Sequence, residues 1–318
     1  MTAIPNPARE RQKVVAIVGL TRCGSTLLDL ALGTQPGIVG LGEIATVLRP
    51  DTADSPRTAL CTCGKVETLC NFWGPMRALL DRHAGADMDE KYRLCLRLFQ
   101  EHFGAGTVLV DSSKNIGSVQ ILKHIAHVDL RVILLVRDVR AWIVSRLDDR
   151  ARNPAKFSTD GVYVRNLRYH FGRAASAVAW MVPWLTRSPI YYGWLWQLQQ
   201  WRLLHRLRAL GVSGYLASYE MFTRAPEQEL RRILSFIGVD QGAGINLPAS
   251  ASHIIAGNPN RDAPGRREHI HYDDRWQGRT DWQLPFRLLP WLSKMNQQLV
   301  YENHGQLLDR RMVDASRP

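Results

Sequence analysis

Apolar residues in this chain gather in two alternating kinds of segment. Short, almost continuously apolar runs cover residues 14–18, 108–110 and 132–136, and a weaker run covers residues 214–217. Such runs are typical of strands that are buried on both faces of a parallel sheet. Apolar residues at helical spacing occupy the segments between them, after residue 25 and at 92–103, 118–127, 141–150, 195–210 and 227–237.

Strands that alternate with helices predict βαβ units with right-handed crossovers. We therefore expect an α/β fold in which helices flank a central parallel sheet. One large domain can absorb this length, and we place it at residues 13–305, between polar tails at 1–12 and 306–318. Because ligands of such sheets bind beyond the carboxyl ends of the strands, the residues after positions 18, 110 and 136 are the first candidates for a site.

The chain is basic, with 41 lysines and arginines against 29 aspartates and glutamates and a formal net charge of +12. Basic proteins favour anionic partners such as nucleic acid, acidic lipid or phosphorylated small molecules. Charge alone, however, fits a solvated basic surface better. Nucleic-acid binding rests on charge alone, so we expect no nucleic-acid partner.

The N-terminus lacks the apolar segment of a secretory signal, and no apolar run reaches membrane-spanning length. The nearest approach, residues 177–195, is interrupted by Pro183, Arg187 and Pro189. We therefore expect a cytoplasmic protein.

A glycine-rich turn follows the first predicted strand, where residues 19–26 read GLTRCGST. The glycines have the spacing of a phosphate-binding P-loop, but Ser25 stands where the P-loop has its lysine. Inward amides, the N-terminus of the following helix, the charge of Arg22 and the hydroxyls of Ser25 and Thr26 all favour an anion. Without the lysine the loop is poorly suited to ATP as a phosphoryl donor. The alternative is a turn with a purely structural role.

A second candidate for anion binding follows the third strand, where residues 136–140 read VRDVR. Arg137 stands at the carboxyl end of that strand, where a guanidinium can hold a phosphate through two hydrogen bonds. Ser145, about two helical turns later and on a similar face, can donate one more. The alternative for Arg137 is a surface ion pair with Asp138 or Asp148.

Two further residues are candidates for acid–base and electrostatic roles. Lys114 follows the second predicted strand and could neutralise charge on a leaving oxygen, although most loop lysines are simply solvated. Glu43, after a turn at residues 35–37, could take a proton from an acceptor hydroxyl. Taken alone, Glu43 fits an exposed or helix-capping glutamate better.

The chain has five cysteines, and three of them lie close together as Cys61, Cys63 and Cys70. Three thiols could bind zinc with a fourth ligand such as His83, but the C-x-C step is shorter than the usual zinc spacing. A structural loop with one disulfide or with free thiols is the simpler interpretation. We therefore predict no metal.

Together these motifs resemble the sulfotransferases that depend on 3′-phosphoadenosine-5′-phosphosulfate (PAPS), over residues 14–276. Residues 22–28, RCGSTLL, are similar to the family's 5′-phosphosulfate loop R-S-G-[ST]-T-L-L. Residues 136–141 with Ser145 resemble V-R-D-P-R-A…S, which binds the 3′-phosphate. Further similar blocks lie at 35–36, 42–43, 110–115, 219–239 and 253–261, and the cysteine segment also recurs in bacterial members.

The resemblance implies a P-loop-like sulfotransferase fold and a reaction in which a sulfuryl group passes from PAPS to an acceptor hydroxyl, leaving adenosine 3′,5′-bisphosphate. It implies no metal. Glu43 is the expected general base, as in the tyrosyl-protein members, and Lys114 the group that stabilises the bridging oxygen. The expected donor-binding residues are Arg22, Cys23, Gly24, Ser25, Thr26 and Leu27 for the phosphosulfate, Arg137 and Ser145 for the 3′-phosphate, and Tyr219 and Arg261 for the nucleotide.

The acceptor is not identified by these motifs. Five tryptophans crowd the stretch 180–201, where aromatic residues either fill the core or line an apolar acceptor site or membrane contact. A small molecule, a glycan, a glycolipid or a tyrosine all fit as acceptors, and nothing in the sequence fixes an oligomeric state. The alternative functions are a P-loop-type small-molecule kinase and a non-catalytic nucleotide-binding module.

Overall fold

Five parallel strands form one sheet in the part of the chain that the structure, a computed structural model, describes. That part comprises residues 11–49, 59–159, 161, 163–164, 179–239, 242, 244–257 and 269–308. The sheet order is β2-β3-β1-β4-β5, with β1 Gln12–Gly19, β2 Ile38–Gly40, β3 Val108–Lys114, β4 Val128–Val136 and β5 Gly214–Ser218. The predicted α/β fold with a central parallel sheet is confirmed.

Helices connect and cover the strands. The α-helices are α1 Ser25–Leu32, α2 Ile44–Val47, α3 Trp73–Arg82, α4 Met88–Phe103, α5 Ile116–His124, α6 Val139–Arg152, α9 Val182–Leu185, α10 Pro189–Leu210, α11 Tyr219–Arg224, α12 Pro226–Ile237, α13 Gln283–Leu288 and α14 Pro290–Asn296. Short 3₁₀ segments are η1 Glu67–Leu69, η2 Pro154–Phe157, η3 Ala179–Met181 and η4 Leu247–Ala249, and η6 Gln297–Glu302 is π-helical. No helix among the described residues has the length and apolar character needed to cross a bilayer.

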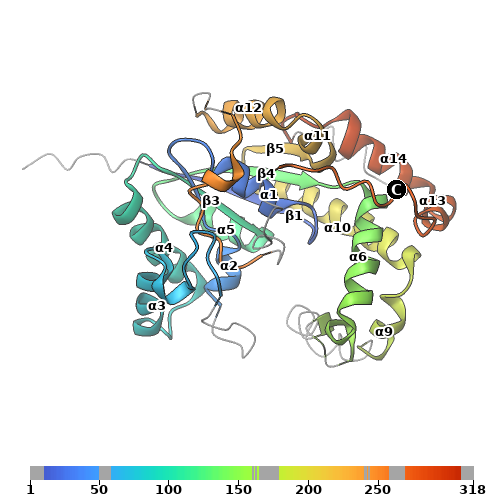
Figure 1. Ribbon diagram of the computed structural model, residues 1–318, viewed down its shortest axis with the longest axis horizontal. Coiled ribbons are helices and arrows are strands. Elements are labelled where there is room, and N and C mark those ends of the chain that lie inside the picture. The colour runs from blue at the N-terminus through green and yellow to red at the C-terminus, as the bar shows by residue number, and fades with distance from the viewer. Residues whose placement is uncertain are drawn as a thin grey trace, which may run out of the picture.

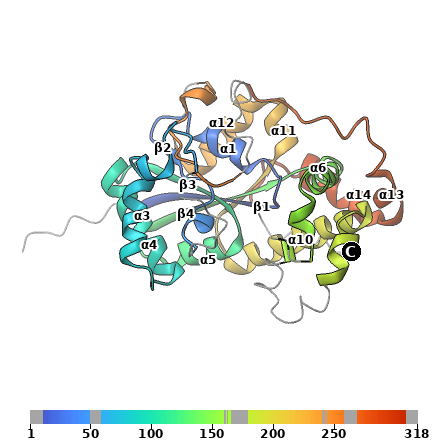
Figure 2. The same cartoon turned by 60° about the horizontal axis from the view of Figure 1, so that its bottom comes forward.

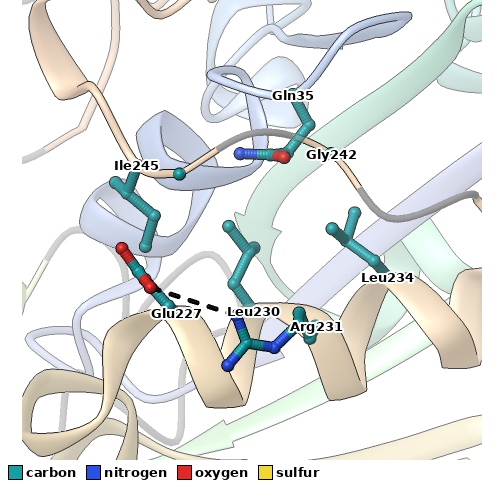
Figure 3. A pocket seen from close by; sticks show the side chains of 8 residues that line it. Gln35, Glu227, Leu230, Arg231, Leu234, Gly242 and Ile245 are labelled. Carbon is teal, nitrogen blue, oxygen red and sulfur yellow. Dashed lines mark ion pairs between the residues drawn. The ribbon is translucent and has the colours of Figure 1, made fainter.

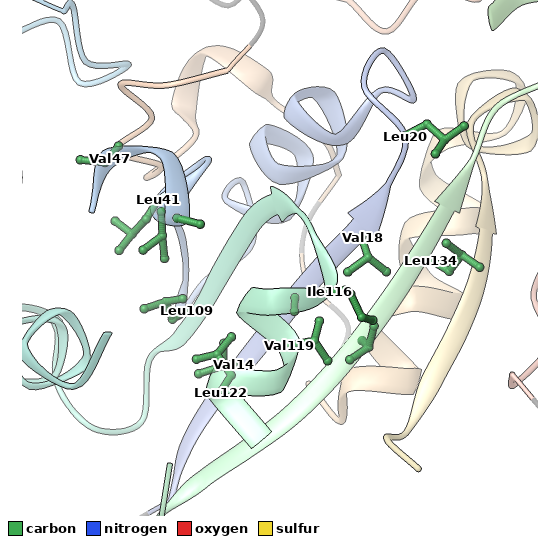
Figure 4. Close-up of a cluster of buried hydrophobic side chains, with 14 of the residues drawn as sticks. Val14, Val18, Leu20, Leu41, Val47, Leu109, Ile116, Val119, Leu122 and Leu134 are labelled. Atoms are coloured by element: carbon green, nitrogen blue, oxygen red, sulfur yellow. The ribbon is translucent and has the colours of Figure 1, made fainter. Parts of the chain in front are cut away.

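The central strand β1 is buried on both faces, which explains its continuous apolar sequence. Val14 and Val18 belong to one core cluster together with residues of α3, α4, α5 and α10, and part of this cluster is seen in Figure 4. Val15 and Ile17 face the opposite way, into a cluster with residues of α1, α11 and α12. The sheet is therefore the middle of three layers, with α1, α11 and α12 on one face and α3, α4, α5 and α10 on the other (Figure 1). In Figure 2 the first three helices lie above the strands.

Several expected boundaries were wrong. The three-residue strand β2 gave no sequence signal of its own and was missed. The helix expected at 118–127 ends at His124, because Ile125 is extended and His127 has a φ of 69°. Gln12 is the buried first residue of β1 and not part of a tail. At the other end, residues 306–308 pair with the edge of β5, through Leu216 N–H to Gln306 O at 3.0 Å and Leu308 N–H to Gly214 O at 2.9 Å.

Candidate active site

The carboxyl ends of the described strands bring the predicted site residues to one edge of the sheet, which we call the carboxyl edge. In sheet order this edge carries Glu43 after β2, Lys114 at the end of β3, the loop 20–24 after β1, Arg137 after β4 and Tyr219 after β5. Parallel strands all end at the same edge, so segments far apart in the chain become neighbours. The phosphate loop thus stands between a carboxylate and lysine on one side and an arginine and tyrosine on the other.

The loop between β1 and α1 has the backbone of an anion site. Gly24, the N-cap of α1, has a left-handed φ of 99°, and Arg22 has a φ of 71°. No side chain caps the helix, and the amides of Gly24 and Thr26 donate to no acceptor among the described residues. Free amides at the positive end of a helix can bind a phosphate or sulfate.

Two residues that were expected to bind the donor, Cys23 of the loop and Leu27 of α1, turn their side chains into the protein. Cys23 is buried in the core cluster that contains Ile17 and Leu28, and its amide donates to Leu20 O at 3.1 Å. Burial raises the pKa of its thiol, which stays protonated. Leu27 packs against the same cluster. The thiol and amide of Cys23 thus both face groups of the protein, and the expected contact of Cys23 with the donor stays a prediction.

Arg137 is buried at the end of β4, with 6% of its surface exposed. Its Nη1 donates to Arg22 O at 2.9 Å, its Nη2 donates to Asp273 Oδ2 at 2.6 Å, and the guanidinium lies 4.7 Å from the centroid of the Tyr219 ring. Its Nε is buried without a hydrogen-bond partner among the described residues. A Cβ at position 24 would collide with the same tyrosine ring, so glycine there lets the loop pack against Tyr219.

The alternative ion pairs considered for Arg137 do not form. Asp138 binds Arg140 Nη2 at 2.6 Å, and Asp148 binds Arg275 Nη1 at 2.9 Å. The partner is instead Asp273, which lies in a C-terminal segment that crosses the carboxyl edge. No local sequence pattern indicates this contact, because the two residues are 136 positions apart.

Helix α6 braces the phosphate loop from the β4 side. Arg22 Nη2 lies 2.7 Å from Asp149 Oδ1, and Trp142 Nε1 donates to Thr21 O at 2.7 Å. Ser145 is buried in the same helix, and its hydroxyl makes no hydrogen bond to another described residue. The charge of Arg22, which was expected to bind an anion directly, is therefore paired with a carboxylate of α6.

Glu43 and Lys114 form an ion pair on the other side of the loop. Glu43 Oε1 accepts from Lys114 Nζ, and Glu43 Oε2 accepts from Thr46 Oγ1 at 3.2 Å. The Lys114 side chain is 13% exposed and that of Glu43 is 20% exposed, so both remain accessible. Lys114 has a φ of 64°, at a shift in the register between β1 and β3. Backbone of this uncommon kind is found preferentially at functional sites.

A buried carboxyl that sequence reasoning missed holds this half of the carboxyl edge together. Asp29 of α1 is fully buried; its Oδ2 accepts from Gly42 N–H at 3.2 Å and from Ser112 Oγ at 2.8 Å, and its Oδ1 accepts from Ser252 Oγ at 3.4 Å. Burial raises its pKa to about 7. Asp29 therefore positions Gly42, and with it the neighbouring Glu43. The sequence feature that could have indicated this role is a single aspartate inside the largely apolar helix STLLDLAL.

Comparison with protein-family models gave a match over residues 15–242 to the model described as the sulfotransferase family. The chain belongs to the sulfotransferase family. The match includes the phosphate loop, Glu43, Lys114, Arg137 and Tyr219, so every strand end of the carboxyl edge lies within it.

Two solved sulfotransferase structures are distantly similar. The sulfotransferase domain of an olefin synthase from Synechococcus PCC 7002 is 18% identical, with a TM-score of 0.35, and the alignment covers 98% of this chain and 95% of that one. A sulfotransferase from Alicyclobacillus acidocaldarius is 19% identical, with a TM-score of 0.41, over 80% of this chain and 88% of that one. Neither likeness is close enough to carry information about an acceptor. No curated protein matched the sequence.

The tryptophan-rich stretch divides between core and surface in this sulfotransferase. Trp196 is fully buried, and its Nε1 donates to Arg137 O at 3.1 Å. Trp180, Trp184 and Trp194 are exposed. The core interpretation is therefore confirmed for Trp196, whereas an acceptor or membrane role for the three exposed tryptophans stays a prediction. Arg261, expected near the nucleotide, lies outside the described residues.

A small cavity of about 60 Å³ lies away from the carboxyl edge, beside the end of α1. Gln35, Leu230 and Leu234 line it, and Glu227 and Arg231 of α12 form an ion pair 3.9 Å long at its side (Figure 3). The cavity is much smaller than the space a nucleotide needs. Gln35, part of one of the motifs, therefore belongs to the packing of α1 against α12.

Proposed function

We propose that this sulfotransferase takes the sulfuryl group of PAPS and transfers it to a hydroxyl of its acceptor, releasing adenosine 3′,5′-bisphosphate. One observation carries the proposal: the order of groups along the carboxyl edge. An anion-binding loop lies between the Glu43–Lys114 pair and the buried Arg137 beside Tyr219. A donor with a reactive anhydride at one end and a second phosphate at the other suits such an edge.

The residues present fit this donor. The free amides of Gly24 and Thr26 suit the 5′-phosphosulfate. The buried Nε of Arg137, which has no partner among the described residues, suits an additional anionic oxygen such as one of the 3′-phosphate. The ring of Tyr219 contacts both Gly24 of the phosphate loop and the guanidinium of Arg137. Ser145 remains a predicted ligand of the 3′-phosphate, and Arg261 a predicted ligand of the nucleotide.

PAPS supplies a sulfuryl group that is already activated by its anhydride bond to phosphate. The acceptor oxygen forms a bond to sulfur, the bond between sulfur and the 5′-phosphate oxygen breaks, and that oxygen keeps the electron pair. Glu43 takes the proton of the acceptor hydroxyl, and Lys114 stabilises the charge on the leaving oxygen. Because the two side chains already contact each other, base and cation are held together before the substrates arrive.

Calorimetry tests the donor part of the proposal. Adenosine 3′,5′-bisphosphate should bind at least about tenfold more tightly than AMP, because a second charged group is held only in the first case. Equal affinities would refute the two-site arrangement.

Incubation with labelled PAPS and a fractionated extract of the native cell, followed by mass analysis, tests transfer and searches for the acceptor. A labelled, sulfated product is the expected result. Tight binding of PAPS without transfer to any fraction would favour the non-catalytic nucleotide-binding module. Phosphoryl transfer from ATP would favour the kinase, against which Ser25 at the lysine position already argues.

A further inference from the structure

Four potential metal ligands meet beside Trp73, the first residue of α3, and outside the residues assigned to sulfuryl transfer. They are the thiols of Cys61, Cys63 and Cys70 and the imidazole of His253, which we call the cysteine–histidine cluster. Their ligand atoms all lie within 4.8 Å of one another. Cys61 and Cys70 are buried, His253 is half-buried and Cys63 is exposed.

The separations within the cluster match the edges of a tetrahedron around one ion. Cys70 Sγ lies 3.7 Å from Cys61 Sγ and 3.8 Å from Cys63 Sγ. His253 Nδ1 lies 3.2 Å from Cys70 Sγ and 3.8 Å from Cys61 Sγ. With zinc–sulfur bonds of about 2.3 Å and zinc–nitrogen bonds of about 2.0 Å, a regular tetrahedron has edges of about 3.8 Å between sulfurs and about 3.5 Å between sulfur and nitrogen.

The backbone around the thiols is arranged to hold them in this way. Gly64, with a φ of 84°, closes a tight turn in which its N–H donates to Cys61 O at 2.9 Å, and Cys61 N–H donates to Lys65 O at 2.8 Å. Trp73 N–H lies 3.5 Å from Cys70 Sγ and donates to it. Amide donors of this kind stabilise a thiolate and orient it toward a metal.

The histidine is fixed independently. His253 N–H donates to Gly40 O at 2.6 Å, and His253 O accepts from Trp73 Nε1 at 2.5 Å. Next to it, Thr62 and Ile254 join the two segments, because Thr62 N–H donates to Ile254 O at 3.1 Å and Ile254 N–H donates to Thr62 Oγ1 at 2.9 Å. Backbone hydrogen bonds therefore hold the segment of His253 next to the segment of the three cysteines.

We propose that Cys61, Cys63, Cys70 and His253 bind one zinc ion, through their Sγ atoms and His253 Nδ1. Three thiolates and one imidazole in tetrahedral geometry select zinc among the common divalent ions. The ion has four protein ligands and no open position, so its role is structural. This zinc site replaces the prediction of free thiols and no metal. Its fourth ligand is His253 rather than His83, and His253 lies 183 positions away from Cys70 in the sequence.

The ion would also tie a remote segment to the carboxyl edge. The residues directly after His253 contact the proposed active site: a Cβ at position 42 would meet Ile254 and Ala256 O, and one at position 257 would meet Thr26 Oγ1 and Glu43 Oε1. The zinc ion therefore anchors both the loop 59–73 and the chain segment that lies against Glu43.

The metal content of the wild-type protein, purified without chelator, gives the direct test. Elemental analysis should find about one zinc per chain, and exchange with Co²⁺ should give the visible absorption bands of tetrahedral cobalt with thiolate ligands. Wild-type protein that contains no zinc and takes up neither zinc nor cobalt would overturn the proposal, whether or not any variant folds. The measurement needs no nucleotide, so it is independent of the proposed function.

Four variants locate the ion. Cys70→Ser and His253→Ala should each lower the zinc content at least about tenfold, while His83→Ala and Cys95→Ala should retain it. His83 is the exposed histidine at the end of α3, and Cys95 is a buried thiol of α4 outside the cluster.

Should the first two variants fail to fold, chelation of the wild-type protein replaces them. Loss of zinc should lower the Tm of the protein and should make Cys61, Cys63 and Cys70 reactive toward thiol reagents. Zinc that persists in both variants, or chelation that leaves these thiols equally reactive, would refute this ligand set.

Discussion

The two halves of the carboxyl edge hold their charges in different ways. On the β2–β3 half, Lys114 and Glu43 pair with each other, and both belong to segments attached directly to neighbouring strands. On the β4–β5 half, Arg137 pairs with Asp273, which comes from a distant C-terminal segment. The ion pair of the first half thus joins two segments attached to adjacent strands, whereas the ion pair of the second half forms only when the C-terminal segment folds back over the strand ends.

In the proposed function, this difference separates nucleotide binding, on the β4–β5 half, from sulfuryl transfer, on the β2–β3 half. An anion that approaches Nη2 of Arg137 must compete with the carboxylate of Asp273, which Arg275 also holds through two hydrogen bonds of 2.7 Å. No residue from outside the neighbouring strands and their loops pairs with Lys114 in the described part of the chain. We therefore expect changes in the C-terminal segment to alter affinity for the nucleotide and changes at Lys114 to alter turnover.

The largest effect is expected for Lys114→Ala. Removing a cation that stabilises the leaving oxygen should lower the rate of transfer about 100- to 1000-fold, while the affinity for PAPS changes only about threefold. Single-turnover transfer from labelled PAPS measures the rate, and calorimetry measures the affinity. Lys123→Ala, on the exposed surface of α5, is the control. Lost affinity with normal turnover of bound donor would place Lys114 in the binding half instead.

The buried carboxyls of the two halves give the next largest difference. Glu220, on the β4–β5 half, is fully buried, its Oε1 has no partner among the described residues, and burial raises its pKa to about 7. A folded pKa above the unfolded value of 4.5 means that its contribution to stability is complete below pH 4.5 and is lost as the pH rises through 7. The loss is on the order of 3 kcal/mol.

Glu220→Gln should remove that loss, because glutamine does not ionise. The free energy of unfolding of the variant, relative to wild type, should therefore rise between pH 4.5 and pH 8, as measured by denaturant unfolding at each pH. Asp29→Asn differs from it, because burial also raises the pKa of Asp29 to about 7 but the carboxyl accepts three hydrogen bonds, so this variant should be less stable than wild type at pH 4.5. A parallel pH dependence in wild type and Glu220→Gln would show that Glu220 is ionised in the folded protein.

Arg137→Ala should weaken binding of adenosine 3′,5′-bisphosphate about 100-fold and leave the affinity for AMP nearly unchanged, because only the 3′-phosphate loses its charged partner. Calorimetric titration of both nucleotides measures the difference. Arg97→Ala, an exposed arginine of α4, should have no effect on either. Equal losses for the two nucleotides would mean that Arg137 holds the loop rather than the 3′-phosphate.

The smallest effect is expected for Asp273→Asn. Removing the competing negative charge should tighten binding of adenosine 3′,5′-bisphosphate by about threefold. The neighbouring Asp274→Asn, which removes one exposed charge without touching Arg137, is the matched control. Weaker binding in Asp273→Asn alone would show that the carboxylate orients Arg137 for the nucleotide instead of competing with it.

Much of the site could be predicted from the sequence because its residues are attached to strand ends. The apolar runs at 14–18 and 132–136 predicted two buried strands, and a parallel sheet places the residues that follow such strands at one edge. Lys114, Arg137 and the phosphate loop follow from that rule alone. The short strand β2 could not be found in this way, because three residues are too few to show a periodicity.

The sequence by itself determined the parallel sheet, the phosphate loop and the kinds of charge at each strand end, since these follow from local patterns and a single topological rule. Only the tertiary structure decided which distant groups complete them: Asp273 on Arg137, Ser252 on Asp29 and His253 beside the three thiols. The physical reason is that each of these contacts joins segments more than a hundred residues apart, where burial and hydrogen bonding choose the partner and no local pattern records the choice.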